Sequence, residues 1–143
     1  MNAFHLLSRR LQSLNLVAEI EALLDEMDGR IITLVQGQLA EGKRGDGSLM
    51  PKYSPSTKLI KQRKGRTLIG ERISLIDTGE FWRGFFATTY SGDIEVDSKE
   101  WKRDFLVERY GEEIFQVSVD SLSVIVDELF PKLQKNVHDY LSR

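Results

Sequence analysis

The sequence predicts an α+β fold, in which a small antiparallel sheet of three or four strands packs against a long N-terminal helix and a C-terminal helix. Apolar residues recur at three- and four-residue steps near both ends of the chain, as they do along one face of a helix. Between these segments, two β-prone runs flank a turn sequence at residues 91–93. With 143 residues the chain can bury a core of its own, so we expect a single domain over residues 1–143.

The first region of this domain, residues 1–40, is expected to be helical. Apolar side chains at Phe4, Leu7 and Leu11 predict a short amphipathic helix that ends near residue 14. Asn15 can cap a second, longer helix. The apolar stripe of that helix is Val17, Ile20, Leu24, Met27, Ile31, Leu34 and Val35. Gly29 costs it about 1 kcal/mol relative to alanine and is where a bend would fall.

The second region, residues 42–66, combines a flexible loop with a short basic helix. Three glycines and one proline among the twelve residues 42–53 predict a mobile loop. The loop does not match a phosphate-binding fingerprint, because no strand precedes it and no Ser or Thr follows a Lys. Ser54 and Pro55 begin a helix, whose basic part at residues 58–64 ends at Gly65.

The third region, residues 67–143, holds the sheet and the C-terminal helices. An apolar run stops at Asp77-Thr78-Gly79 and resumes with three Phe and one Trp within residues 81–86. Both alternating faces of that segment carry large apolar groups, which predicts a central strand buried on at least one side, after a turn or helical turn at residues 77–80. A strand near residues 68–76 and a hairpin over residues 87–97 complete the expected sheet.

Two helices are expected after the hairpin. Ser98 can cap a helix over residues 99–110, which Gly111 ends. Its inward-facing residues would be Trp101, Phe105 and Leu106. A short extended link at residues 113–116 follows.

The last helix spans residues 119–141, with Ser118 or Asp120 as its cap. Its apolar stripe is Leu122, Ile125, Val126, Leu129, Leu133, Val137 and Leu141. Because Pro131 removes one hydrogen bond inside the helix, we expect a kink or a break near Leu129.

Composition narrows the classes of protein to consider. The chain has no cysteine, which excludes a disulfide framework, a thiol nucleophile and a Cys-containing zinc site. Its first ten residues hold too short an apolar run for a signal peptide, and no segment approaches the roughly 20 apolar residues of a membrane span. We therefore expect a soluble, unsecreted protein without a membrane partner.

Positive charge is concentrated in one segment. Residues 42–72 contain nine basic and two acidic residues, a net charge of +7, so the rest of the chain carries −9 of the total of −2. Such asymmetry favours a surface that faces an anionic partner, either nucleic acid or an acidic protein surface, although a solvated face fits it equally well. The candidate contact residues are Lys43, Arg44, Lys52, Lys58, Lys61, Arg63, Lys64 and Arg66.

Two short motifs also carry a resemblance. The first is Leu75 with Asp77-Thr78-Gly79 and Phe81, and the second is Tyr110-Gly111 with Ile114 and Phe115. In this order, after a basic loop and before a C-terminal helix, they resemble the small virion morphogenesis proteins of tailed bacteriophages. These are the tail-completion and neck components, or head-tail connectors, that join capsid to tail. The resemblance spans roughly residues 45–141, and the first forty residues are longer and more helical than the shared part needs.

The resemblance implies a structural virion protein that is not an enzyme and that is made in the bacterial host cytoplasm. It implies a homo-oligomeric ring between portal and tail. The partners would be other virion proteins, namely the portal or adaptor and the tail tube or terminator, with possible contact to packaged DNA. The 42–66 loop and basic helix would contact neighbouring subunits.

Two alternatives of other classes remain open. Asp97-Ser98-Lys99, with Asp77 upstream and Glu95 two residues before, matches the Asp and Asp-x-Lys pattern of Mg²⁺-dependent nucleases, in which two carboxylates hold the metal and the Lys stabilises charge on the reacting phosphate. The purely structural interpretation is that Ser98 and Lys99 begin a helix and that Asp77 forms a turn. A non-catalytic DNA-binding accessory protein would use the basic segment alone.

No residue is assigned a catalytic role, and neither a cofactor nor a metal is expected. His5 and His138 lie near opposite ends of the chain without neighbours at metal-ligand spacing. No Gly-x-Ser-x-Gly nucleophile elbow is present. The aromatic residues 81–86 are expected to pack in the core, because buried aromatic side chains dominate small cores.

Overall fold

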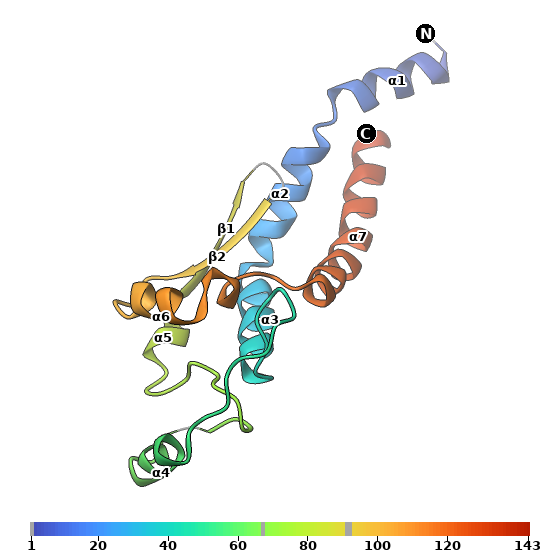
Figure 1. The fold of residues 1–143 in the computed structure, drawn as a ribbon. Coiled ribbons are helices and arrows are strands. Elements are labelled where there is room, and N and C mark those ends of the chain that lie inside the picture. The colour runs from blue at the N-terminus through green and yellow to red at the C-terminus, as the bar shows by residue number, and fades with distance from the viewer. Residues whose placement is uncertain (1, 67, 91–92) are drawn as a thin grey trace.

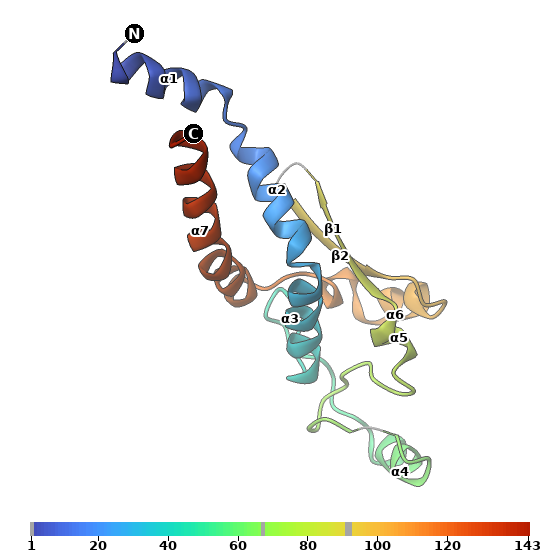
Figure 2. The same cartoon turned by 180° about the vertical axis from the view of Figure 1, so that it is seen from behind.

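The fold was analysed in a computed structural model that describes residues 2–66, 68–90 and 93–143. The molecule is elongated, with both termini at one end and α4 at the opposite end (Figures 1 and 2). The elements in chain order are α1 (Ala3–Ser13), α2 (Leu16–Glu26), α3 (Asp28–Ala40), α4 (Pro55–Arg63), α5 (Glu80–Arg83), β1 (Phe85–Tyr90), β2 (Asp93–Ser98), α6 (Arg103–Tyr110), the 3-10 helix η1 (Glu112–Ile114) and α7 (Val119–Leu141). The α+β class predicted from the sequence is confirmed.

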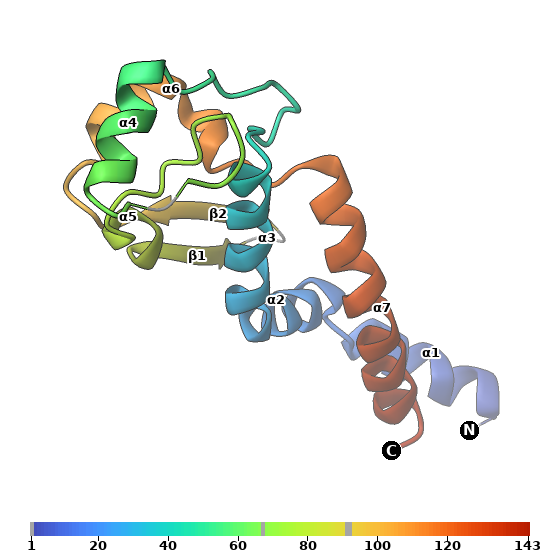
Figure 3. The same cartoon turned by 90° about the horizontal axis from the view of Figure 1, so that it is seen from below.

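The N-terminal region is helical, but the long helix expected after Asn15 is divided into α2 and α3. The side chain of Asn15 accepts a hydrogen bond from the backbone N–H of Ala18, as a helix cap should. Met27, with φ −98° and ψ 7°, ends α2 and begins α3, so the bend expected near Gly29 occurs two residues earlier. Helix α3 lies between the hairpin and α7, as Figure 3 shows from below.

The described residues form one sheet of two antiparallel strands, with Phe85 opposite Ser98 and Tyr90 opposite Asp93. Residues 91 and 92 of the expected hairpin turn lie outside the described part of the chain. The predicted sheet of three or four strands is not confirmed. In place of a third strand, the segment before α5 makes one isolated antiparallel bridge, between Lys52 and Arg72.

The aromatic residues form the centre of the core, but the prediction that a strand begins at residue 81 is wrong. Residues 80–83 make one helical turn, and β1 begins only at Phe85. This turn places Phe81 against Phe85 with ring centroids 5.1 Å apart and an interplanar angle of 87°. Phe115 packs on both rings, at 5.8 Å from Phe81 and 5.4 Å from Phe85.

The segment around α6 departs most from expectation. The helix begins at Arg103 instead of Lys99, because residue 98 is still paired in β2. Trp101 and Phe105 do not face inward: they are 80% and 58% exposed. The extended link expected at residues 113–116 is instead the end of η1, and it buries Ile114 and Phe115 in the core.

Helix α7 has the predicted bounds, and its cap is Ser118, whose hydroxyl accepts from the N–H of Ser121 at 3.1 Å. Of the kink or break expected near Leu129, the break does not occur, since the helix continues through Pro131. Gln38, a buried residue of α3, joins the start of α7 to the core. Its side-chain oxygen accepts from Ser118 N–H at 2.9 Å and from the Ser121 hydroxyl at 2.8 Å.

Candidate functional site

Helix α4 presents the basic segment at the end of the molecule farthest from the termini (Figure 1). Ser54 caps it by accepting from Thr57 N–H at 3.2 Å, Pro55 occupies the first turn, and Gly65 follows it with φ 65°, all as the sequence predicts. The helix contains no acidic residue. Its positive charge is therefore not neutralised by neighbours on the same helix.

One face of α4 is tied to the body by Lys61. This side chain is buried, and its ammonium donates to the backbone oxygen of Ile76 at 2.7 Å. The Asp77 carboxylate lies 3.7 Å from Lys61 Nζ and 3.5 Å from Arg66 Nε. The ring of Tyr53 lies 5.3 Å from the same ammonium. The Asp-Thr-Gly turn therefore holds the basic helix in place.

The loop before α4 is also fastened to the body. Arg44 donates from Nε to the backbone oxygen of Tyr110 at 2.7 Å and from Nη1 to that of Leu49 at 2.7 Å. Gly45 donates its N–H to the oxygen of Glu113 at 2.9 Å, and Met50 is fully buried. A side chain at position 45 would place its Cβ 2.0 Å from the backbone oxygen of Gln116, so only glycine fits this approach.

The eight candidate basic residues thus divide by what they contact. Arg44, Lys61 and Arg66 make intramolecular polar contacts with the body of the protein. Lys43 and Lys52 form long, exposed ion pairs with Glu41 and Glu71, at 3.7 Å and 3.9 Å. Of these eight candidates, Lys58, Arg63 and Lys64 form neither an ion pair nor a side-chain hydrogen bond with another described residue. These three, all on or directly after α4, are free to meet a partner.

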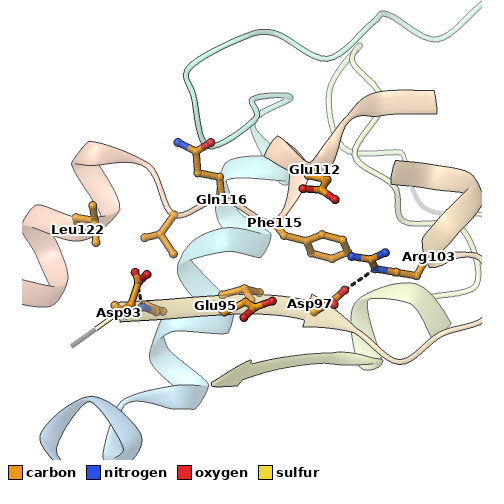
Figure 4. A pocket seen from close by; sticks show the side chains of 11 residues that line it. Asp93, Glu95, Asp97, Arg103, Glu112, Phe115, Gln116 and Leu122 are labelled. Carbon is orange, nitrogen blue, oxygen red and sulfur yellow. Dashed lines mark hydrogen bonds and ion pairs between the residues drawn. The ribbon is translucent and has the colours of Figure 1, made fainter. Parts of the chain in front are cut away.

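A groove of about 430 Å³ with acidic walls runs along β2 (Figure 4). Asp93, Glu95 and Asp97 occupy alternate positions of the strand, and Glu112 faces them from η1. Asp97 accepts from Arg103 Nε at 2.7 Å, and hydrogen bonds to Asp97 and then Asp104 raise the pKa of the Arg103 guanidinium. Among the described residues the other three carboxylates of the groove form no ion pair, so it carries net negative charge.

Sequence reasoning missed this groove, although the sequence contains a signal for it. In residues 93–98 the acidic residues Asp93, Glu95 and Asp97 alternate with Ile94, Val96 and Ser98, which places all three carboxylates on one face of the strand. The contribution of Glu112 depends on the turn at Gly111, whose φ of 91° is a conformation that glycine adopts readily.

The residues of the nuclease hypothesis have other contacts. Asp77 is near Lys61 and Arg66, Asp97 binds Arg103, and Lys99 Nζ lies 5.3 Å from the centre of the Phe86 ring. In the part of the chain that the structure describes, no group of three or more His, Asp or Glu side chains is arranged to hold a metal ion.

The end of the molecule opposite α4 exposes apolar side chains. Helix α1 has no buried residue and touches the last turns of α7, where Ser13 and Tyr140 share a hydrogen bond of 2.5 Å. The large exposed apolar residues of α1 are Phe4, Leu6, Leu7 and Leu11. None of the helices over the described residues is both long enough and apolar enough to cross a membrane.

Comparison with known proteins adds no further assignment. No family model, no curated protein and no solved structure matches this chain.

Proposed function

We propose that this chain is a structural virion protein of a tailed phage or prophage. In this proposal it is a neck or tail-completion subunit that forms a ring between portal and tail, and it is made in the bacterial host cytoplasm. The observation that carries the proposal is the presentation of Lys58, Arg63 and Lys64 on a helix that is fastened to the body through Lys61. A charged surface held in this way favours fast and specific encounter with a macromolecule of opposite charge.

The residues that resemble the phage proteins support the proposal, because they lie where one structural element of this fold is connected to the next. Asp77 holds α4, and Gly79 takes φ 88° directly before α5. Gly111 takes φ 91° between α6 and η1, and Ile114 behind it is fully buried. Residues with such roles would be needed by any chain that builds the same subunit.

The proposed partners are further virion proteins. The exposed apolar side chains of α1, which begin at Phe4 (75% exposed), offer the kind of surface that an obligate assembly buries. We assign this end of the subunit to the portal or adaptor, or to the tail tube or terminator. The charged surfaces around α4 and β2 are then left for contacts between subunits or with DNA.

Deletion of the coding sequence from the phage or lysogen tests the proposal. We expect lysates that contain capsids and tails but few joined particles in electron micrographs, and recovery of infectivity when the wild-type chain is supplied from a plasmid. A plasmid with an early stop codon is the control for the supplied chain. Normal particles and normal infectivity without the chain would overturn the proposal.

A further inference from the structure

We propose that α4 of one copy of this chain docks into the acidic groove along β2 and η1 of a second copy. This inference rests on the proposed ring and identifies the surfaces that would close it. The two surfaces are complementary in charge, because α4 has no acidic residue whereas the groove brings four carboxylates together with one arginine.

The face that α4 offers is defined by helix geometry. Leu59 and Arg63 are four residues apart, as are Ile60 and Lys64, so these four side chains lie on one stripe of the helix. Leu59 and Ile60 are 47% and 51% exposed, so the helix presents two adjacent aliphatic side chains to solvent. The stripe combines an apolar centre with two unpaired cations, while Lys61 turns toward the body.

The groove has matching parts. Glu95 and Glu112 line it from two sides and form no ion pair within the described residues, and Val117 and Leu122 add apolar surface to its wall. An exposed apolar pair flanked by cations therefore fits this groove better than a wholly polar helix would. Burying the cations of α4 against these carboxylates also favours this partner over one without matching charges, because the buried cations would then be left unpaired.

The outer edge of β2 favours a helix as the occupant over an added strand. Lys99 N–H donates to Gly84 O at 3.0 Å, and the alternation of an antiparallel pair then turns the N–H groups of Ile94, Val96 and Ser98 away from β1. Those of Ile94 and Ser98 are already satisfied by the preceding carboxylate, at 3.0 Å from Asp93 Oδ1 and 2.8 Å from Asp97 Oδ1. Carboxylates therefore occupy two of the three donors that an added strand would need along this edge.

The contact must join different copies, since α4 cannot reach its own groove while it is tied to Ile76. Helix α6 separates the two surfaces: Lys102 lines a small cavity of about 140 Å³ beside Lys61, whereas Arg103 lines the acidic groove. A subunit can therefore offer its α4 to one neighbour and its groove to another. Such a head-to-tail contact produces a ring when the rotation between copies closes, and a filament when it does not.

Charge exchange between the two surfaces tests the inference on the full chain. We would compare the wild type with Arg63→Glu/Lys64→Glu, with Glu95→Lys/Glu112→Lys and with the combined four-residue exchange, by sedimentation velocity over a range of concentrations. Either double variant should raise the concentration of half-assembly at least about tenfold, because like charges then oppose each other. The combined exchange should restore assembly, which a variant that merely misfolds would not do.

Matched controls lie beside each surface. Lys58→Glu changes an unpaired cation on the other flank of α4, and Glu108→Lys changes an exposed carboxylate on α6 outside the groove. Both should assemble like the wild type. Cross-links between residues of α4 and of β2 or η1, found only in the oligomer, would place the contact directly.

Several results would overturn the inference. One is a wild type that stays monomeric at its highest soluble concentration, and another is double variants that assemble as the wild type does. A third is loss of duplex DNA binding in Arg63→Glu/Lys64→Glu with assembly unchanged, which would assign α4 to DNA. Each of these results is compatible with a chain that phage particles need in order to join capsid to tail, so it would overturn this inference without overturning the proposed function. Conversely, the charge exchange could succeed in a chain that particles do not need, and the proposed function alone would then fail.

Discussion

The ammonium nitrogen of Lys61 lies 3.7 Å from the carboxylate of Asp77 and so joins the basic helix to the Asp-Thr-Gly turn. The lysine side chain is only 11% exposed, whereas that of the aspartate is 53% exposed. The pair is therefore asymmetric: the buried Lys61 ammonium has Ile76 and Asp77 as its polar partners, whereas the Asp77 carboxylate is also open to water. The position of α4 depends on this contact more than the stability of the whole fold does.

Replacement of Asp77 tests that difference. Asp77→Asn should lower the free energy of unfolding by at most about 1 kcal/mol, because the Asp77 side chain is exposed and Lys61 keeps its hydrogen bond to Ile76. It should nevertheless speed tryptic cleavage and amide exchange in residues 55–66, because Lys61 and Arg66 both lose their carboxylate partner. Asp127→Asn, at an exposed site on α7, is the control. Unchanged exchange in α4 would contradict the role assigned to Asp77.

The aromatic residues give a second test. Phe81→Ala should cost about 3–5 kcal/mol, since Phe81 is buried against Phe85 and Phe115. Trp101→Ala should change the free energy of unfolding by less than about 0.5 kcal/mol, because its side chain is 80% exposed. Urea unfolding of both variants measures the two costs. A large loss in Trp101→Ala would show that this residue packs inward after all.

The buried hydrogen bonds of Gln38 lead to a third prediction. Gln38→Leu should destabilise the protein by about 1–3 kcal/mol, because the N–H of Ser118 and the hydroxyl of Ser121 lose their acceptor. Gln134→Leu, on the exposed side of α7, should have little effect. Chemical denaturation provides the comparison, and equal effects of the two substitutions would contradict the importance of the network.

Asp28 predicts a pH dependence. Burial, and then the neighbouring Asp25, raise the pKa of the Asp28 carboxyl above its ordinary 3.8, and its Oδ1 has no hydrogen-bond donor. A raised folded-state pKa means that the ionised form weakens the fold at neutral pH, and that this penalty disappears as the pH falls through the folded pKa. Asp28→Asn should therefore be more stable than the wild type at neutral pH, and the gain should vanish below 3.8.

Urea midpoints of the wild type and Asp28→Asn across this pH range measure the gain. An advantage of Asp28→Asn that stays constant down to the acid end would contradict the proposed cause, since it would not depend on the charge of Asp28.

The elements that the sequence predicts well are those with strong local signals. Ser54-Pro55 and Gly65 mark both ends of α4, and Ser118 with the apolar repeat gives the bounds of α7, in which Leu122 and Val126 of that repeat are nevertheless exposed. Pro131 does not break α7 because the apolar residues on either side, such as Leu129 and Leu133, still pack against the core. In this helix, burial outweighs one lost hydrogen bond.

The errors have physical causes that a single sequence hides. Phe81 and Phe85 fall on the same face at a spacing of four residues, whether the segment is a helical turn or a strand, so their burial could not distinguish the two. The strand expected near residues 68–76 is not formed at Ser74, where the backbone makes hydrogen bonds to side chains instead of to another strand. Its N–H donates to Tyr53 Oη at 3.3 Å and its oxygen accepts from Trp82 Nε1 at 3.1 Å.

Long-range geometry also hid the candidate surfaces. The basic residues could be named from the sequence, but which of them are used internally depends on Tyr110 and Ile76, which are distant in the chain from Arg44 and Lys61. The acidic groove depends likewise on η1 coming to lie beside β2.

The measurement that most directly tests the central claim is quantitative peptide mass spectrometry of purified particles from the source phage or induced lysogen, compared with the soluble lysate. A structural neck subunit should be retained in particles at a fixed, low ratio to the portal protein, and the ratio should survive further purification. Recovery of the chain only in the soluble fraction would contradict the account, and cleavage assays with Mg²⁺ on the wild type and Asp97→Ala would then be the next step.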